Sequence, residues 1–189
     1  MLKSVNFLNF IKLYIFFSRI LDCFSINELN EKYAPILLEC MKQGNSEIRK
    51  LACQNLVTFL QINYHSKKKS EIIKHLFDNF MKAKNYQRRM IYLDFCSLCF
   101  QTFAFNFLKL YIIPDCFELS NDRVANIRIK LCKMLPELRN YILPTDGETL
   151  NKFNNVLNKL LEDKDQDVFE VTYFSINLSY FHFFSIFLI

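Results

Sequence analysis

The sequence has very few of the residues that end secondary structure. Its 189 residues include two glycines, four prolines and no tryptophan. Glycine and proline are the usual residues of tight turns, so their scarcity predicts long elements with few sharp reversals. It also argues against a glycine-rich phosphate-binding loop, and the motifs GxxxxGK[ST], GxGxxG, HExxH and GxSxG are all absent. We therefore expect a protein that is not an enzyme and uses no cofactor.

Neither sign of charge dominates the chain. The 24 Lys and Arg residues exceed the 19 Asp and Glu residues by only 5, and the excess is spread along the sequence. A nucleic-acid partner is therefore not expected. Hydrophobic residues make up 51% of the chain, including 21 Phe, which is too apolar for a disordered protein. The length is sufficient for one domain with a sizeable core.

The patterns that resemble metal or redox sites are incomplete. Most of the seven cysteines stand among apolar residues, where a thiol behaves as a small hydrophobe in a reducing compartment. Cys96 and Cys99 form a CxxC without a second CxxC or a nearby His pair, so we interpret them as core residues. Asp163, Asp165 and Asp167 alternate as in a calcium loop, but the required Gly and the final Glu are missing. We therefore expect no metal here, and a solvated turn.

Both ends of the chain are apolar. Residues 1–30 predict an N-terminal apolar helix, because polar residues including Lys12 and Arg19 form one stripe. Leu8 lies 40 residues before Ile48, which stands near the start of the second helix of a later repeat, so we interpret this helix as the second helix of a partial repeat. Residues 169–189 are interpreted as an apolar C-terminal tail, and the sequence leaves open whether this tail belongs to the repeat array. The stretch 171–189 approaches the length of a membrane span, which Asn177 and His182 argue against. The alternatives are a membrane segment and a tail outside the natural fold, as from a truncated or mis-spliced gene.

Four segments between the two ends share one pattern. Each has an apolar helix, a short polar turn and a second apolar helix. Near the start of the second helix stands an Ile, Val or Arg, and in three of the four segments the next residue is Arg. These repeats begin at Tyr33, Glu71, Tyr111 and Leu150. The short basic run at 67–69 falls between the first two repeats, and we interpret it as a solvated linker.

The register of the four repeats can be counted. Equivalent positions, separated by 40, 39 and 41 residues, are held by Ile48, Arg88, Ile127 and Val168. The residues that follow them are Arg49, Arg89, Arg128 and Phe169. A period near 40 with two helices per repeat is typical of HEAT-type arrays. The sequence therefore predicts an all-α fold, an α-α superhelix (HEAT/armadillo-type solenoid) of about four helix pairs over residues 31–168.

The recurring arginine is interpreted as a structural residue rather than a ligand-binding one. Its position is fixed by the repeat and not by any one site. The aliphatic stem can pack along the helix while the guanidinium reaches an acidic or carbonyl group in the turn of an adjacent repeat. The whole set of Ile48, Arg49, Arg88, Arg89, Ile127, Arg128 and Val168 is then expected to hold neighbouring repeats in register.

Three stretches carry a resemblance to a known family. NYQRRMIYLDFCSLC, IPDCFELSNDRVANIRIKLCKMLPELRNYILPTD and LNKFNNVLNKLLEDKDQDV resemble the HEAT-repeat regulatory subunits of the protein phosphatase 2A class. The resemblance covers roughly residues 33–168, and its most specific parts are RVANIRIKLCKMLPEL and KLLEDKDQDV. It implies a non-catalytic scaffold that binds a serine/threonine protein phosphatase catalytic subunit in the cytoplasm.

The same resemblance implies that partners bind at the turns inside the repeats. The candidate interface residues are Asn45, Asn85, Tyr86, Asp122, Arg123 and Lys164. Phe169 departs from the pattern, because it stands where the other repeats have Arg. Two alternatives stay open: a HEAT-repeat adaptor of another complex, in transport or at the cytoskeleton, and a protein tethered to a membrane by residues 171–189.

Overall fold

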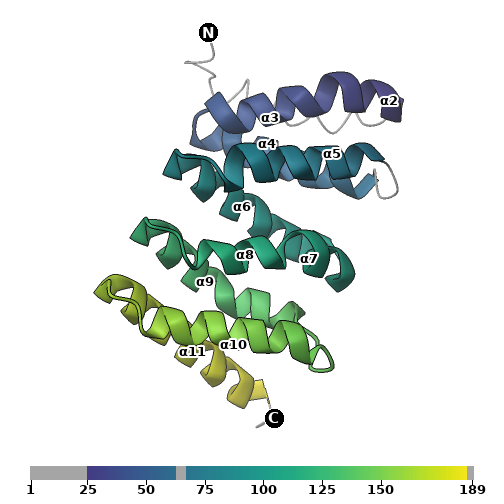
Figure 1. Ribbon diagram of the computed structural model, residues 1–189. Coiled ribbons are helices and arrows are strands. Elements are labelled where there is room, and N and C mark those ends of the chain that lie inside the picture. The colour runs from purple at the N-terminus through teal and green to yellow at the C-terminus, as the bar shows by residue number, and fades with distance from the viewer. Residues whose placement is uncertain (1–24, 63–66, 187–189) are drawn as a thin grey trace. The chain divides into compact units, whose positions relative to one another are not determined.

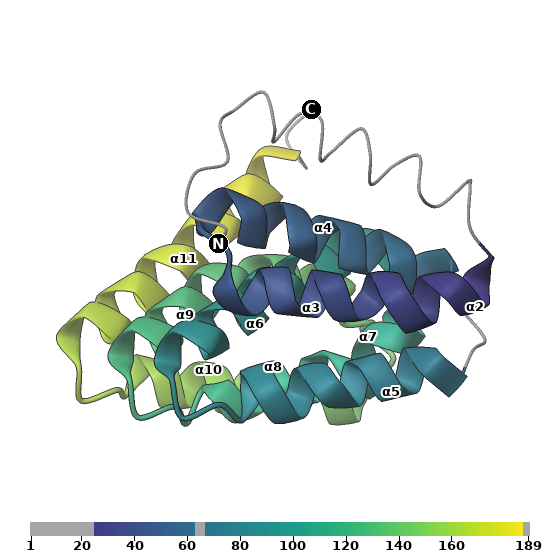
Figure 2. The ribbon, with the colours of Figure 1, turned by 90° about the horizontal axis from the view of Figure 1, so that it is seen from above.

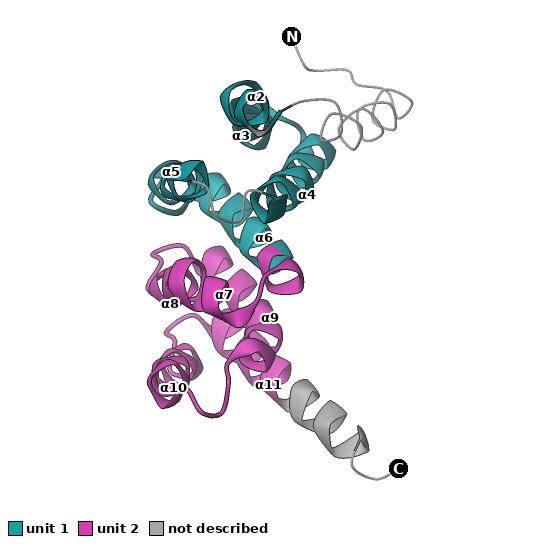
Figure 3. Ribbon diagram, turned by 90° about the vertical axis from the view of Figure 1, so that its right-hand side faces the viewer, with its two compact units in different colours: residues 1–98 teal, residues 99–189 magenta. Residues whose placement is uncertain are grey.

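The structure, a computed structural model, describes residues 25–62 and 67–186, and the side chains of all these residues except Ile26 and those at 177–186. Every regular element in these ranges is a helix (Figure 1). The chain divides into two compact units, residues 1–98 and 99–189, which are taken separately below (Figure 3). Most of the N-terminal helix predicted at 1–30 lies outside the described residues.

Unit 1 contains two repeats. In the first, α2 (Ile26–Glu28), the π-helical turn η1 (Leu29–Tyr33) and α3 (Ala34–Gln43) follow one another without a break. They are followed by α4 (Ser46–Ile62), which packs against α3. The second repeat consists of α5 (Lys67–Leu76), the π-helical turn η2 (Phe77–Met81) and α6 (Tyr86–Thr102), whose last residues belong to unit 2.

Unit 2 contains the other two repeats, arranged in two layers. They consist of α7 (Phe105–Tyr111), α8 (Ile113–Leu119) and α9 (Ala125–Tyr141), then α10 (Gly147–Leu161) and α11 (Gln166–Ile186). The first helices α8 and α10 contact each other in one layer, and the second helices α9 and α11 pack together in the other (Figure 2). In unit 2 the helix pair of one repeat is therefore covered by the pair of the other.

Prolines explain the departures from regular α-helix in the first helices of the first and third repeats. Pro35 has no N–H to donate to the preceding turn, and the helix widens just before it, so that the Ala34 N–H donates to the Leu29 carbonyl. Pro114 has the same defect, and the helix breaks at Ile112 into α7 and α8. Pro136 lies inside α9, but the helix continues through it to Tyr141. It therefore does not end the helix.

The predicted register coincides with the observed helices. The second helices begin at Ser46, Tyr86, Ala125 and Gln166, and each position counted from the sequence is the third residue of its helix. Ile48, Ile127 and Val168 are buried there, with exposed fractions of 3%, 0% and 0%. The predicted fold class, an all-α helical repeat, is confirmed.

The core is built from the apolar faces of these helices. Leu37 and Met41 of α3 are fully buried, as are Leu131 and Leu135 of α9 to within 1%. Cys96 and Cys99 are both completely buried, in agreement with their interpretation as core residues. The prediction for the basic run 67–69 is wrong, because it forms the first turn of α5 and Lys69 is only 5% exposed. The helix α5 begins at Lys67, four residues before Glu71, where the apolar pattern of the second repeat was expected to begin.

The predicted C-terminal tail, 169–189, overlaps α11, which runs from Gln166 to Ile186. Across the described ranges, none of the helices combines the length and the apolar character needed to cross a membrane. The division into an N-terminal helix, a repeat array and a tail stays a prediction.

Replacing either of the two glycines by alanine is expected to change the free energy of unfolding, but in opposite directions. A Cβ added at Gly44, between α3 and α4, would lie 2.5 Å from the Cys40 carbonyl oxygen and 2.6 Å from Cγ2 of Ile48. Gly44→Ala is therefore expected to lower the free energy of unfolding by about 1–3 kcal/mol. A Cβ at Gly147, the first residue of α10, would meet nothing within 4 Å.

The control, Gly147→Ala, is therefore expected to raise the free energy of unfolding by about 0.4–1 kcal/mol. Urea denaturation followed by circular dichroism measures both values. Equal effects of the two substitutions would contradict the close approach between α3 and α4 at this turn.

Candidate functional site

Arg128 joins the two turns of unit 2. Its Nε and Nη2 donate to the two carboxylate oxygens of Asp163, at 2.6 and 2.8 Å, and its Nη1 donates to the backbone carbonyl of Asp122 at 2.6 Å. Asp122 lies in the turn before α9 and Asp163 in the turn before α11. The side chains of Arg128 and Asp163 are 7% and 8% exposed. A buried bidentate pair of this kind fixes both the distance and the orientation of the turns.

The electrostatics of the pair follow from these contacts. The hydrogen bonds from Arg128 lower the pKa of Asp163, against the opposing effect of burial. The same bonds raise the pKa of Arg128. Asp163 also accepts the N–H of Asp165, and Asp165 accepts the N–H of Val168 at 3.4 Å, near the start of α11. These carboxylates are engaged by the protein itself.

The turn expected to be solvated at 163–167 is so only in part, since the Asp163 side chain is 8% exposed and paired with Arg128, whereas Lys164, Gln166 and Asp167 are exposed. Across the described ranges, no group of three or more His, Cys, Asp or Glu side chains is placed to hold a metal ion.

The other recurring arginines have different partners. Arg89 is 7% exposed and donates to the carbonyl oxygens of Ala83 and Lys84 in its own turn. Arg49 is half-buried, and its Nε has no hydrogen-bond partner among the described residues. In the fourth repeat, Asp163 stands six residues before Phe169. In the second repeat, the residue six positions before Arg89 is Ala83. The turn of the second repeat, which follows the repeat of Arg49, therefore has no carboxylate equivalent to that of Asp163, the partner of Arg128.

The remaining register positions have their own environments. Arg88 is half-buried, and Phe169, at the position of the missing fourth arginine, is 41% exposed. The assignment of the whole set to holding repeats in register stays a prediction.

Three of the six candidate interface residues accept backbone N–H groups at the starts of the second helices. The Asn45 side-chain oxygen accepts the Ile48 N–H, and that of Asn85 accepts the Gln87 N–H, both at 2.9 Å. These two side chains satisfy helix N–H groups that have no partner inside the helix. Asp122 accepts the N–H of Val124, the residue before α9, at 2.9 Å, and this contact closes the turn rather than capping the helix.

The other three candidates point outward. Tyr86 is 43% exposed, and Arg123 and Lys164 are also exposed. Asp122, Arg123 and Lys164 all line one groove in unit 2. Asn45, Asn85 and Tyr86 belong to unit 1 and do not line it.

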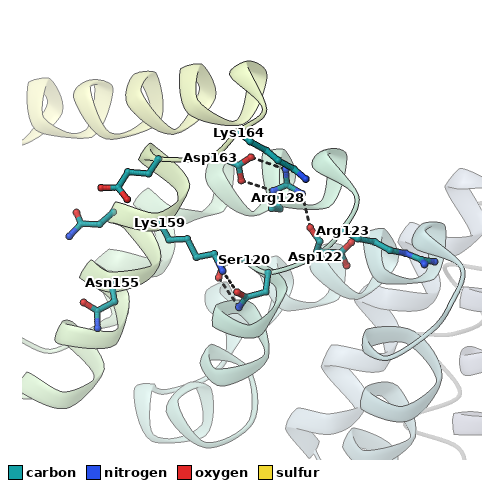
Figure 4. A pocket seen from close by; sticks show the side chains of 11 residues that line it. Ser120, Asp122, Arg123, Arg128, Asn155, Lys159, Asp163 and Lys164 are labelled. Atoms are coloured by element: carbon teal, nitrogen blue, oxygen red, sulfur yellow. Dashed lines mark hydrogen bonds and ion pairs between the residues drawn. The ribbon is translucent and has the colours of Figure 1, made fainter.

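This groove has a volume of about 630 Å³ and is lined by eleven residues, all of them polar or charged. They come from the α8–α9 turn, from α9 (Arg128), from α10 and from the α10–α11 turn. Figure 4 shows Asn155 and Lys159 on α10, with Arg128 and Asp163 linked beside them. We call this feature the turn groove. Because the buried Arg128–Asp163 pair is part of its lining, the same contact that joins the turns also shapes the groove.

The turn groove is weakly positive. Once the Arg128–Asp163 pair is set aside, it has three cations, Arg123, Lys159 and Lys164, against two carboxylates, Asp122 and Glu162. Lys159 donates to the side-chain oxygen of Asn121. Arg123 and Lys164 form no ion pair with any residue that the structure describes. The two turns therefore present positive charge that a partner can use.

The residues of α10 that line the turn groove, Asn155, Asn158 and Lys159, were not found from the sequence. Sequence reasoning placed the interface in the turns, whereas α10 contributes an entire side of the groove. The available signal was the spacing of Asn155, Asn158 and Glu162, which places them on one face of a helix. That signal does not reveal that the face lies opposite the α8–α9 turn, which depends on tertiary packing.

Fold and groove together define the class: an all-α helical-repeat protein with a polar surface along its turns. No protein-family model matches the chain. Over 126 residues it is 32% identical to serine/threonine-protein phosphatase 4 regulatory subunit 4 of Homo sapiens, and 31% identical to the protein of that name from Mus musculus. Each match covers 66% of this chain and 14% of the relative. The resemblance predicted from the sequence is confirmed as this partial match.

The buried pair predicts strong energetic coupling between the two turns. Asp163→Asn or Arg128→Gln leaves the other side chain buried without its partner, which costs about 3–5 kcal/mol of stability. The double variant is expected to lose less than the sum of the single losses, by about 0.5–3 kcal/mol. Urea denaturation of the four proteins gives the coupling free energy.

The matched control is the exposed pair Glu148–Lys152 on α10, whose side chains are 71% and 61% exposed. Its coupling is expected to be too small to measure, because solvent screens an exposed pair. A coupling free energy for Arg128 and Asp163 as small as that of the control would contradict their role in joining the turns.

The lowered pKa of Asp163 predicts a pH dependence with a definite sign. Because the pKa is lower in the folded than in the unfolded chain, the contribution of Asp163 is complete above its ordinary value of 3.8. It is lost as the pH falls through the lowered pKa. The difference in unfolding free energy between the wild type and Asp163→Asn should therefore shrink on going from about pH 7 to about pH 2.5. A difference that is constant or grows over this range would contradict the assignment.

Proposed function

We propose that the protein is a non-catalytic regulatory or scaffold subunit that binds a serine/threonine protein phosphatase catalytic subunit of the phosphatase 4 type. The observation that carries the proposal is the match to two phosphatase 4 regulatory subunits over 126 residues. The matched region spans about one seventh of the length of those relatives. That this chain has the regulatory role of the whole relative is therefore part of the proposal.

The structure supports a binding role through the turn groove. The four repeats are proposed to be HEAT repeats, and their turns the surface that meets the phosphatase. Asp122, Arg123 and Lys164 are gathered in one groove, whose eleven lining residues are all polar or charged. Protein interfaces outside their hydrophobic centre are built from polar groups of this kind. We further propose a cytoplasmic location, as for a partner of a cytoplasmic phosphatase.

Affinity purification tests this function directly. A tagged chain expressed in cells is expected to recover a serine/threonine phosphatase catalytic subunit, identified by mass spectrometry. Arg123→Glu together with Lys164→Glu reverses the two cations of the turn groove that form no ion pair with described residues. This double variant is expected to reduce recovery of the phosphatase by tenfold or more, because like charges across an interface cost several kcal/mol.

The control reverses two exposed lysines that lie outside the groove, Lys50→Glu together with Lys133→Glu. It makes the same change in net charge and is expected to leave recovery unchanged. Recovery of transport or cytoskeletal proteins with no phosphatase would contradict the proposal and favour an adaptor of another complex. Equal recovery by the two double variants would remove the turn groove from the interface.

A further inference from the structure

We infer that the turn groove binds a partner segment in extended conformation, by its main chain, through the side-chain amides of Asn155 and Asn158. The inference rests on the proposed function, since it takes the same groove as the binding surface. It adds the form in which the partner is bound and the chemistry that recognises it.

The first observation is the asparagine content of α10. Four of its fifteen residues are asparagines, Asn151, Asn154, Asn155 and Asn158, and all four are exposed. None of the four side chains forms a hydrogen bond within the described part of the chain. Asparagine is one of the weaker helix formers, so these residues lower the intrinsic stability of α10 relative to alanine. The stability of the helix therefore does not explain their presence.

The second observation is the position of two of the four. Asn155 and Asn158 line the turn groove, followed on the same face by Lys159 and Glu162. From Asn155 to Glu162 the helix rises about 10 Å, which is the length of about three residues of extended chain. The side of the groove that α10 forms therefore matches a short extended segment rather than a single functional group.

The chemistry of the amides favours main-chain recognition. A side-chain amide has two N–H donors and a carbonyl acceptor, the same groups that a peptide bond presents. An extended segment that is not part of a sheet leaves its N–H and C=O groups without partners, and these need partners when water is excluded. Asn155 and Asn158 can supply both kinds of partner whatever the side chains of the segment.

The lining of the groove argues against other ligands. Pockets for small molecules are predominantly apolar, and none of the eleven lining residues is apolar. Binding of a nucleic acid depends on several neutralised phosphates, whereas the groove has a net charge of only about +1 after its buried pair is set aside. A peptide segment fits both observations.

The charges of the turns add a preference for one kind of side chain. Arg123 and Lys164 are exposed at the two turns and form no ion pair with the described residues. A carboxylate of the bound segment can accept hydrogen bonds from either of them, which are stronger than bonds between neutral groups. We therefore assign to the groove an extended segment that contains at least one Asp or Glu.

The experiment uses random linear peptides displayed on phage and selected on the full chain. Enriched sequences are synthesised, and their Kd is measured by fluorescence anisotropy. Enriched peptides are expected to contain Asp or Glu. Asn155→Ala combined with Asn158→Ala is expected to raise Kd about tenfold, the effect of losing about two hydrogen bonds. Methylation of single main-chain nitrogens of the peptide is expected to weaken binding as well.

The control combines Asn106→Ala with Asn154→Ala, two exposed helical asparagines of unit 2 that do not line the groove. All four changes replace asparagine by a better helix former, so none is expected to unfold the protein. The control should leave Kd unchanged. Failure to enrich any peptide, or equal affinity for the two double variants, would overturn the inference.

Recovery of the phosphatase by the same variants separates this inference from the proposed function. If the wild type recovers a phosphatase but no peptide binds the groove, the inference is wrong and the function stands. If peptides bind through Asn155 and Asn158 but no phosphatase is recovered, the main-chain recognition stands and the proposed function is wrong.

Discussion

One constraint governs this structure: a helix pair of a single repeat cannot bury its apolar faces alone. In unit 2 the face of α9 is covered by α10 and α11, and Ile127, Leu131 and Val168 are completely buried as a result. The contact between the second helices also includes a polar detail, because the Thr172 hydroxyl lies 2.9 Å from Cys132 Sγ and donates to the Val168 carbonyl. Stacking of this kind fixes the separation of successive repeats.

The turn groove is a consequence of that stacking. When α10 packs on α8 and α9, the α8–α9 turn and the α10–α11 turn are brought to one end of the two pairs. The Arg128–Asp163 pair then joins the turns, and α10 supplies the other side of the groove. A stable apolar core thus positions polar side chains that have no role in the core. The turn groove is thus preorganised by the packing of the helices and by the Arg128–Asp163 pair.

The sequence predicted the features that recur with the repeat. Ile48, Ile127 and Val168 could be aligned by counting, because burial at the equivalent position favours an apolar residue in three of the four repeats. The partner of Arg128 could be predicted only as an acidic or carbonyl group, since the choice of Asp163 depends on the distance between two turns. Asn155 and Asn158 were missed for the same reason. The burial of Lys69 also depends on packing that no local pattern contains.

The central claim, that the turn groove is the surface of unit 2 that meets a phosphatase catalytic subunit, has a direct test. Hydrogen exchange of the chain is measured by mass spectrometry, alone and saturated with the phosphatase 4 catalytic subunit. The account predicts slower exchange of backbone amides at 120–123 and 162–165, and in the second half of α10, because the bound partner excludes water from these amides. Unchanged exchange in these three segments, with protection elsewhere in unit 2, would contradict it.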